Sequence, residues 1–291
     1  MLRGMRGKPK MAIVGAGNFA AALAASLQRS GYEIEAVISR SRAASLKKAR
    51  RLAAVVDAHA FTAIPRTLAA ELIWFCVPDA QIAVAARAFA EKIEWKGRVA
   101  LHSSGALTSD ELAALRSRGA AVASVHPLMT FVRSSRPALA GVPFAVEGDA
   151  AAIRETRRVI KDLGGITHAI RKEDKAAYHA WGTFASPLLT ALLATIERVA
   201  AVAGVNHKDA RRRMIPILRQ TLENYAAFGA PDGYSGPIIR GDVDTVRQHL
   251  RVLRALPEAR AVYVALVRAA LTNLPARNKS ALKKILDSQP G

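Results

Sequence analysis

Cysteine is almost absent from this chain of 291 residues, because Cys76 is its single cysteine. One thiol cannot form an internal disulfide, and a chain without disulfides suits a reducing compartment. The seven histidines are scattered, and none is grouped with Cys76 or with paired acids at a spacing typical of metal ligands. The sequence therefore predicts a cytoplasmic protein without a metal site.

Acidic residues are scarce as well: 23 stand against 43 lysines and arginines, which gives a formal net charge of +20. The basic residues are spread along the chain, and aromatic residues make up only 5% of it. A stacking platform for single-stranded nucleic acid needs aromatic side chains beside the basic ones. We therefore expect no nucleic-acid partner, and a basic surface that attracts an anionic cofactor or substrate.

Long hydrophobic runs are also missing. No uninterrupted apolar segment approaches the ~20 residues of a membrane span. A basic lead-in over residues 1–10 and the apolar stretch after it resemble a secretory signal, but Gly15 and Gly17 interrupt that stretch. We expect neither a secretory signal nor a membrane-spanning segment.

The most informative stretch that is present begins at Met11. The apolar segment 11–14 runs into Gly15-Ala16-Gly17-Asn18-Phe19-Ala20, and a helix-forming run follows at once. Strand, glycine turn and helix in this order are the context of a dinucleotide-binding fingerprint. The first glycine allows the tight turn, and the second lets the backbone approach a diphosphate. We predict that Gly15, Ala16, Gly17, Asn18 and Phe19 bind the cofactor.

The cofactor type follows from the next apolar segment, 34–38, which ends in Ser39-Arg40-Ser41-Arg42. An NAD site would place Asp or Glu there for the ribose 2′-hydroxyl. Two hydroxyls and two guanidiniums instead suit a phosphate, which arginine binds with two parallel hydrogen bonds. The sequence predicts NADP(H), with Ser39, Arg40 and Ser41 at the 2′-phosphate. The alternative is a solvated turn in a chain that is basic throughout.

Apolar segments alternate with helix-like runs as far as residue 171, and no convincing strand follows Lys172. This pattern predicts an α/β fold, a doubly wound parallel Rossmann sheet followed by an all-α C-terminal domain. The expected domains are 8–171, which binds NADP, and 172–291, which is helical. Pro187 lies inside the long helical run 173–203 and predicts an interruption there.

In such a sheet, ligands bind outside the carboxyl ends of the strands. Three apolar segments end there in Cys76-Val77-Pro78-Asp79, His102-Ser103-Ser104-Gly105 and His126-Pro127. We expect Val77 and Pro78 to contact the cofactor, and we expect substrate contacts from Ser103, Ser104, Gly105 and His126. For each residue taken alone, capping a helix or forming a turn is the alternative role.

Several strings along the chain carry a resemblance to a known family. They are Ser103-Ser104-Gly105, the run from Ser124 to Phe131, Lys175-x-x-Tyr178-His179-Ala180, and the run from Gly236 to Asp242. Over about residues 10–275 the chain resembles a bacterial Rossmann family with a C-terminal helical domain of unknown function. That family is labelled deazaflavin-dependent NADP-oxidoreductase-like. It is similar, more remotely, to 6-phosphogluconate and β-hydroxyacid dehydrogenases and to pyrroline-5-carboxylate reductase.

The resemblance implies roles for two residues. Lys175 stands where the β-hydroxyacid dehydrogenases have an acid/base lysine, and His179 stands where they have an asparagine one turn later. Both would act as proton donors, and the alternative is a solvated lysine with a packed histidine. The chain departs from the dehydrogenases at Ala106, where they have glycine, and from the family at Pro187, where it has asparagine. Hydroxyacid chemistry is therefore in doubt. The resemblance also implies a homodimer formed through the helical domain.

The string from Gly236 to Asp242 adds Arg240 as a candidate anchor for a substrate carboxylate or phosphate. His249 follows about two helical turns later, as a second candidate. A rigid turn with Arg240 paired to Asp242 or Asp244 is the alternative.

Two functions remain open from the sequence. The first is an NADP(H)-dependent oxidoreductase that transfers hydride to or from a small anionic carbonyl, imine or deazaflavin substrate. The second is a non-catalytic NADP(H)-binding sensor or partner-binding protein.

Overall fold

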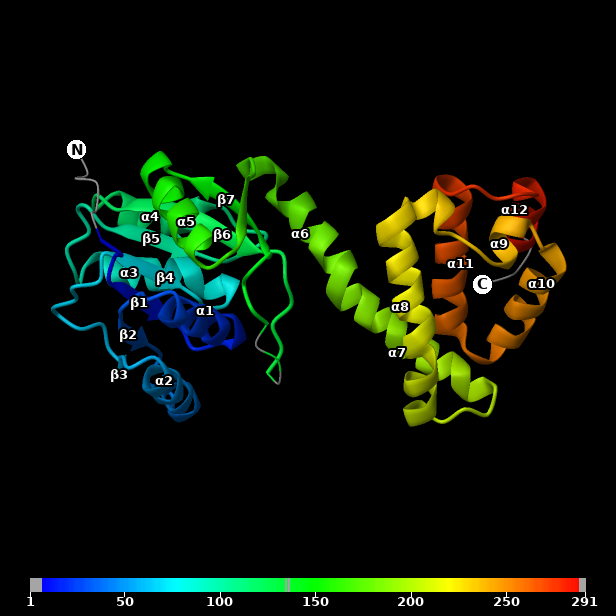
Figure 1. The fold of residues 1–291 in the computed structure, drawn as a ribbon, viewed down its shortest axis with the longest axis horizontal. Coiled ribbons are helices and arrows are strands. Elements are labelled where there is room, and N and C mark those ends of the chain that lie inside the picture. Colours follow the sequence, from blue (N-terminus) through cyan, green and yellow to red (C-terminus); the bar gives the residue numbers. More distant parts are fainter. Residues whose placement is uncertain (1–6, 134, 136, 288–291) are drawn as a thin grey trace. The chain divides into compact units, whose positions relative to one another are not determined.

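The computed structural model describes residues 7–133, 135 and 137–287 of the chain. These residues form two compact units that divide between Phe184 and Ala185 (Figure 1). The sequence predicts the domain boundary at residues 171/172, where the last strand has ended. The first helical turns after that point stay with the first unit because Lys175 is buried against the strand ends.

The first unit contains an eight-stranded sheet in the order β3-β2-β1-β4-β5-β6-β7-β8. Its strands are β1 Met11–Val14, β2 Ile34–Ile38, β3 His59–Phe61, β4 Leu72–Phe75, β5 Val99–His102, β6 Ala121–Pro127, β7 Pro143–Gly148 and β8 Ile166–Ala169. The order reverses direction beside β1, as in a doubly wound fold, so the predicted fold class is confirmed.

One pair in this sheet differs from the parallel arrangement that we expected. Strands β6 and β7 are antiparallel, whereas every other neighbouring pair is parallel. Parallel neighbours need a crossover connection, usually a helix. The chain between Pro127 and Pro143 has no helix among its described residues, so it returns in the opposite direction.

Helices pack on both faces of the sheet, so its central strands β1 and β4 are buried and apolar. On one face lie α1 Asn18–Arg29, α2 Ala43–Val55 and α5 Ala150–Asp162; on the other lie α3 Ile82–Ala90 and the short η2 Ser109–Leu112 and α4 Ala113–Arg116. Strand β4 shows the alternation: Leu72 and Trp74 join the first core, and Ile73 and Phe75 join the second.

The described residues of the second unit form helices joined by loops and contain no strand, as predicted. It comprises α7 Leu189–Val202, α8 His207–Asp232, α9 Pro237–Arg240, α10 Val243–Val252, α11 Pro257–Asn273 and α12 Lys279–Asp287. Its core lies between α10, α11 and α12 and contains Val246, Leu250, Val267, Leu271 and Leu282. The predicted interruption near Pro187 is confirmed, because residues Phe184–Leu188 form a π-turn between α6 Lys175–Thr183 and α7.

The helical run Lys172–Val202 is long and apolar enough to cross a membrane, judged by length and composition alone. The most apolar part of this run is not buried. The expectation from sequence concerned uninterrupted apolar segments, whereas this run contains Pro187 within the π-helical segment Phe184–Leu188. A helix that packs against another protein chain meets the same criteria.

Candidate functional site

The glycine turn after β1 is held between its two neighbouring strands. Gly15 donates from its amide to the carbonyl of Ile38 at 2.8 Å, and Cys76 donates to the carbonyl of Val14 at 2.7 Å. Gly15 has a φ of +107°, and a Cβ on it would lie 2.3 Å from the carbonyl oxygen of Cys76. Only glycine therefore fits at this position, and the turn brings bare backbone to the carboxyl edge of the sheet.

A cavity of about 600 Å³, the first cavity, opens beside this turn. Of the predicted cofactor residues, it is lined by Gly15, Ala16, Gly17, Ser39, Arg40, Val77 and Pro78. Sequence reasoning missed Ser45 and Lys48 on α2, the segment 62–64, and Gln81. Among the described residues that line the cavity, none is acidic, and Arg40 and Lys48 are the cations.

The remaining three predicted cofactor residues lie elsewhere. Phe19 packs edge-on against Trp74 and contacts the ring of Phe131 at 5.1 Å between centroids. Asn18 donates from its side-chain amide to the carbonyl of Phe131 at 3.1 Å. Ser41 is exposed and does not line the first cavity. Phe19 and Asn18 therefore anchor the loop after β6 to the start of α1.

A second group of polar residues gathers where β5 and β6 end, and Lys175 lies at its centre. The Lys175 side chain is only 1% exposed. Its ammonium donates to Oγ of Ser124 at 2.8 Å and to the carbonyl of Ser104 at 3.2 Å. Burial lowers the pKa of Lys175, and the carboxylates of Glu147 and Asp79 partly oppose that shift.

Two histidines meet beside Gly105 in the same group. The rings of His126 and His179 lie 5.7 Å apart between centroids and nearly perpendicular. A Cβ on Gly105 would lie 2.3 Å from Nδ1 of His179 and 2.9 Å from Nε2 of His126, so glycine is required for their approach. The neutral His126 ring carries its hydrogen on Nδ1, because that nitrogen lies 3.1 Å from the carbonyl of Ser103.

Burial lowers the pKa of His126, and the nearby His179 and Lys175 lower it further. The neutral His126 ring therefore leaves a lone pair on Nε2 near neutral pH. The His179 side chain belongs to an exposed residue, and no hydrogen bond to its ring forms among the described residues. These two imidazoles are the groups of the cluster best able to exchange a proton with a ligand.

The serines predicted to bind substrate are occupied within the protein. Ser103 Oγ accepts from the indole nitrogen of Trp74 at 2.8 Å. Ser104 Oγ donates to Asp79 at 2.7 Å and accepts from the amide of Leu107 at 2.9 Å. The structure thus favours the turn and capping role for their hydroxyls.

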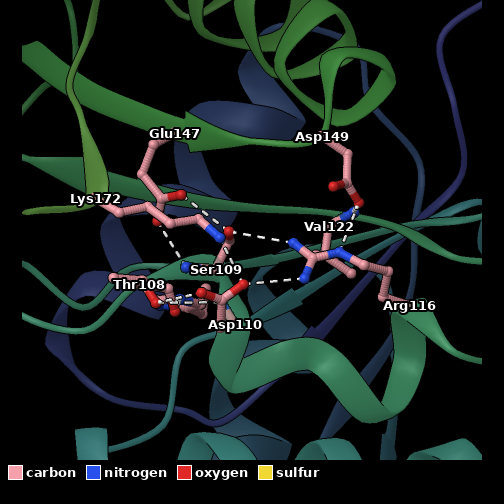
Figure 2. Close-up of polar contacts among 9 residues, drawn as sticks. Thr108, Ser109, Asp110, Arg116, Val122, Glu147, Asp149 and Lys172 are labelled. Atoms are coloured by element: carbon pink, nitrogen blue, oxygen red, sulfur yellow. Dashed lines mark hydrogen bonds and ion pairs between the residues drawn. The ribbon is translucent and has the colours of Figure 1, made fainter.

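The chain before Lys175 is fixed by a network of charges (Figure 2). Glu147 on β7 accepts from the amide of Ser109 at 2.6 Å and from its hydroxyl at 2.9 Å. Arg116 bridges Asp110 and Asp149, and Lys172 donates to Asp110 at 2.6 Å. The hydrogen bonds from Lys172 and Arg116 lower the pKa of Asp110. This network holds the start of the helical run beside the strand ends.

Arg240 and His249 lie in the second unit. His249 Nδ1 lies 3.0 Å from the hydroxyl of Tyr263, and its ring lines an apolar cavity of about 540 Å³. The alternative pairing of Arg240 with Asp242 is not formed as an ion pair among the described residues. Asp242 instead accepts from the amide and the hydroxyl of Thr245 and caps α10.

Two models of known protein domains match this chain. Residues 4–127 match the family model of a Rossmann-like domain, which agrees with the order of the sheet. Residues 142–270 match the model of DUF2520, a domain of unknown function. The two models together cover most of the chain, and they confirm the resemblance inferred from its sequence.

Solved structures share the fold over nearly the whole chain. A Bacteroides fragilis protein described as a candidate NADP oxidoreductase aligns with a TM-score of 0.76 at 21% identity, covering 90% of this chain and 97% of its own. A Thermotoga maritima protein aligns at 0.68 and 22% identity, covering 96% and 98%. A reductive aminase from Aspergillus terreus, solved with NADPH and ethyl-5-oxohexanoate, aligns at 0.67 and 16% identity, covering 96% and 99%. No curated protein sequence matches the chain.

Buried His102 should make the protein less stable in mild acid. Its Nδ1 accepts from the amide of Ser104 at 3.1 Å, and its Nε2 lies 2.9 Å from the carbonyl of Thr108. Burial favours the neutral ring and lowers the pKa of His102 to about 4, although the hydrogen bond with Thr108 partly opposes this shift. Between the ordinary value near 6.5 and pH 4, only the unfolded chain takes up this proton. The free energy of unfolding should fall by about 3 kcal/mol over that window, in addition to contributions from other groups.

Urea unfolding at pH 7, 6, 5 and 4 measures this effect. The variant His102→Gln should lose most of the additional dependence on pH, whatever its stability at pH 7. The variant His168→Gln, which changes an exposed histidine on β8, should keep the wild-type dependence. Equal slopes for all three proteins would show that His102 does not titrate in this way.

Proposed function

We propose that this protein is an NADP(H)-dependent oxidoreductase that transfers hydride to or from a small anionic carbonyl or imine. The observation that carries this proposal is the first cavity, in which the glycine turn meets Arg40 and Lys48 with no acidic residue among the described ones. When bound, NADP(H) supplies or accepts the hydride. A reductive aminase solved with NADPH has the same fold, which supports this cofactor for the present chain.

The residues of the first cavity suit the two parts of a 2′-phosphorylated adenosine. Ser39, Arg40, Ser45 and Lys48 offer two hydroxyls and two cations, which match a phosphate dianion. Ile64, Val84, Ala85 and Phe89 line the same cavity with apolar side chains, which suit a planar base. An acidic side chain for a free ribose 2′-hydroxyl is absent from the described lining.

We expect NADPH to bind more tightly than NADH in isothermal titration calorimetry. Arg40→Ala should weaken NADPH binding about tenfold or more and leave NADH binding nearly unchanged, because a charge-assisted contact to the 2′-phosphate is lost. The control Arg42→Ala removes the same charge two residues away, outside the lining of the cavity, and should have little effect. If the wild-type protein bound neither nucleotide, the proposed function would be wrong.

For the proton that accompanies hydride transfer, we assign His179 and His126 as the exchanging groups. The sequence predicted Lys175 in this role together with His179. The Lys175 ammonium is buried and engaged by Ser104 and Ser124, so a positioning role fits it better. His179 can donate a proton to the oxygen or nitrogen of the substrate as hydride reaches its carbon. His126 offers its unprotonated Nε2, beside Gly105, as the second group that can exchange a proton with the substrate.

Turnover tests this assignment, with a panel of small ketoacids and cyclic imines as substrates. His179→Gln and His126→Gln should each lower kcat roughly a hundredfold while NADPH affinity stays unchanged. His168→Gln is the matched control. Hydride exchange with a deazaflavin should depend little on these groups. NADPH oxidation by an added deazaflavin that survives both substitutions, without turnover of the panel, would therefore favour a deazaflavin as co-substrate.

A non-catalytic NADP(H)-binding sensor or partner-binding protein is the second candidate. The internal bonds of Ser103, Ser104 and Lys175 favour it, because they leave few polar groups for a substrate. Tight NADPH binding without turnover on any member of the panel would support this function over the first.

We also propose that the protein is a cytoplasmic homodimer whose second unit provides the contact. Helix α8 leaves Ile217, Leu222, Tyr225 and Phe228 exposed at 60% or more of their surface. Apolar surface of this extent marks an interaction site. The helical run Lys172–Val202 begins beside the sheet, where Lys175 bonds to Ser124 on β6. This attachment to a folded unit favours contact of the apolar helix with another protein chain over insertion into a membrane.

Analytical ultracentrifugation should find a dimer for the wild-type protein. The double variant Leu222→Glu/Phe228→Glu should sediment as a monomer, because two charges would be buried in the contact. Gln248→Glu/Gln220→Glu adds the same charge at polar exposed positions and should remain dimeric. A monomeric wild-type protein would contradict the proposal.

A further inference from the structure

A second cavity, of about 290 Å³, lies on the other side of the glycine turn. It shares Ala16, Gly17 and Lys48 with the first cavity, so the two meet at the turn. Its other lining residues are Asn18, Ala21, Arg51, Leu52, Val55, Val132 and Arg133. No acidic residue is among them.

Three cations therefore converge on this space from two distant parts of the chain. Lys48 and Arg51 lie three residues apart on one face of α2, where side chains are neighbours. Arg133 comes from the loop after β6. All three residues are exposed, and within the described part of the chain none of them forms a hydrogen bond or an ion pair. Like charges gathered without a counter-charge favour the binding of an anion.

The position of Arg133 is set by contacts of its own loop. Asn18 holds the carbonyl of Phe131 at 3.1 Å, and the Phe131 ring packs on Phe19 at 5.1 Å. The amide of Ser135 donates to the carbonyl of Val132 at 3.1 Å and turns the chain there. The loop after β6 is therefore anchored to the start of α1, and Arg133 follows the anchor by two residues.

We propose that Arg51 and Arg133, supplied by α2 and by the loop after β6, bind the diphosphate that the glycine turn is expected to receive. This inference rests on the proposed function. The two phosphates carry about two negative charges and must pass over the glycine turn, where the cavities join. Ser39, Arg40 and Ser45 line only the first cavity, so the 2′-phosphate has its own guanidinium and two hydroxyls there. Lys48 lies between the two subsites. The loop after β6 thereby becomes a cofactor-binding element outside the fingerprint.

Binding of three probes distinguishes this subsite from the first. NADPH and NADH both contain the diphosphate, whereas adenosine 2′-monophosphate has the 2′-phosphate without it. Arg51→Gln and Arg133→Gln should each weaken NADPH and NADH binding about tenfold, by similar factors, and leave adenosine 2′-monophosphate binding unchanged. Arg50→Gln is the control, because it removes the same charge from the neighbouring residue of α2, outside the lining.

The possible outcomes separate this inference from the proposed function. A loss for NADPH alone would place the two arginines at the 2′-phosphate and overturn the inference. Affinities equal to those of Arg50→Gln for all three probes would overturn it too. In both cases the wild-type protein still binds NADPH, so the proposed function stands. A wild-type protein that binds neither dinucleotide would instead overturn the proposed function, and this inference with it.

Discussion

The buried ammonium of Lys175 connects the first helical turns after β8 to the carboxyl edge of the sheet. Removing a charge from water is costly unless hydrogen bonds compensate for it. Here Ser124 on β6 and the carbonyl of Ser104 after β5 supply those bonds, and Asp79 and Glu147 add an opposite charge nearby. The first helical turns after β8 therefore stay with the sheet. His179, one turn beyond Lys175 on the same helix face, consequently reaches Gly105 and His126.

Two different chemical environments lie along this edge of the sheet. Beside β1 and β2, the cavities contain backbone, hydroxyls and cations, an arrangement that suits phosphate groups. Beside β5 and β6 lie the imidazoles of His102 and His126, whose pKa values are lowered by burial and by the neighbouring positive charge of Lys175. The parallel order of β2, β1, β4, β5 and β6 produces this division, because it brings all their carboxyl ends to one edge. A dinucleotide bound across that edge would run from one environment toward the other.

Much of the fold followed from local pattern, since the order of strand, glycine turn and helix depends on neighbouring residues alone. The glycine turn, Arg40, Val77 and Pro78 all line the first cavity as expected. The direction of β7 was not predicted, because apolar content does not reveal whether a loop or a crossover helix joins two strands. Arg51 and Arg133 were not predicted as cofactor residues because they lie far apart in the sequence, and each looks like an ordinary surface arginine. Only the fold brings them to one cavity.

The amino-acid sequence alone determined the class of fold, the turn that only glycine can form, and the basic composition of the segment after β2. These properties arise from short-range sterics, hydrophobic periodicity and charge. Tertiary structure decided that Lys175 is buried, that the hydroxyls of Ser103 and Ser104 are already bonded, and that His126 and His179 meet beside Gly105. It also placed Arg240 and His249 in a different unit. Burial and proximity come from packing between segments distant in the chain, so no local pattern could contain them.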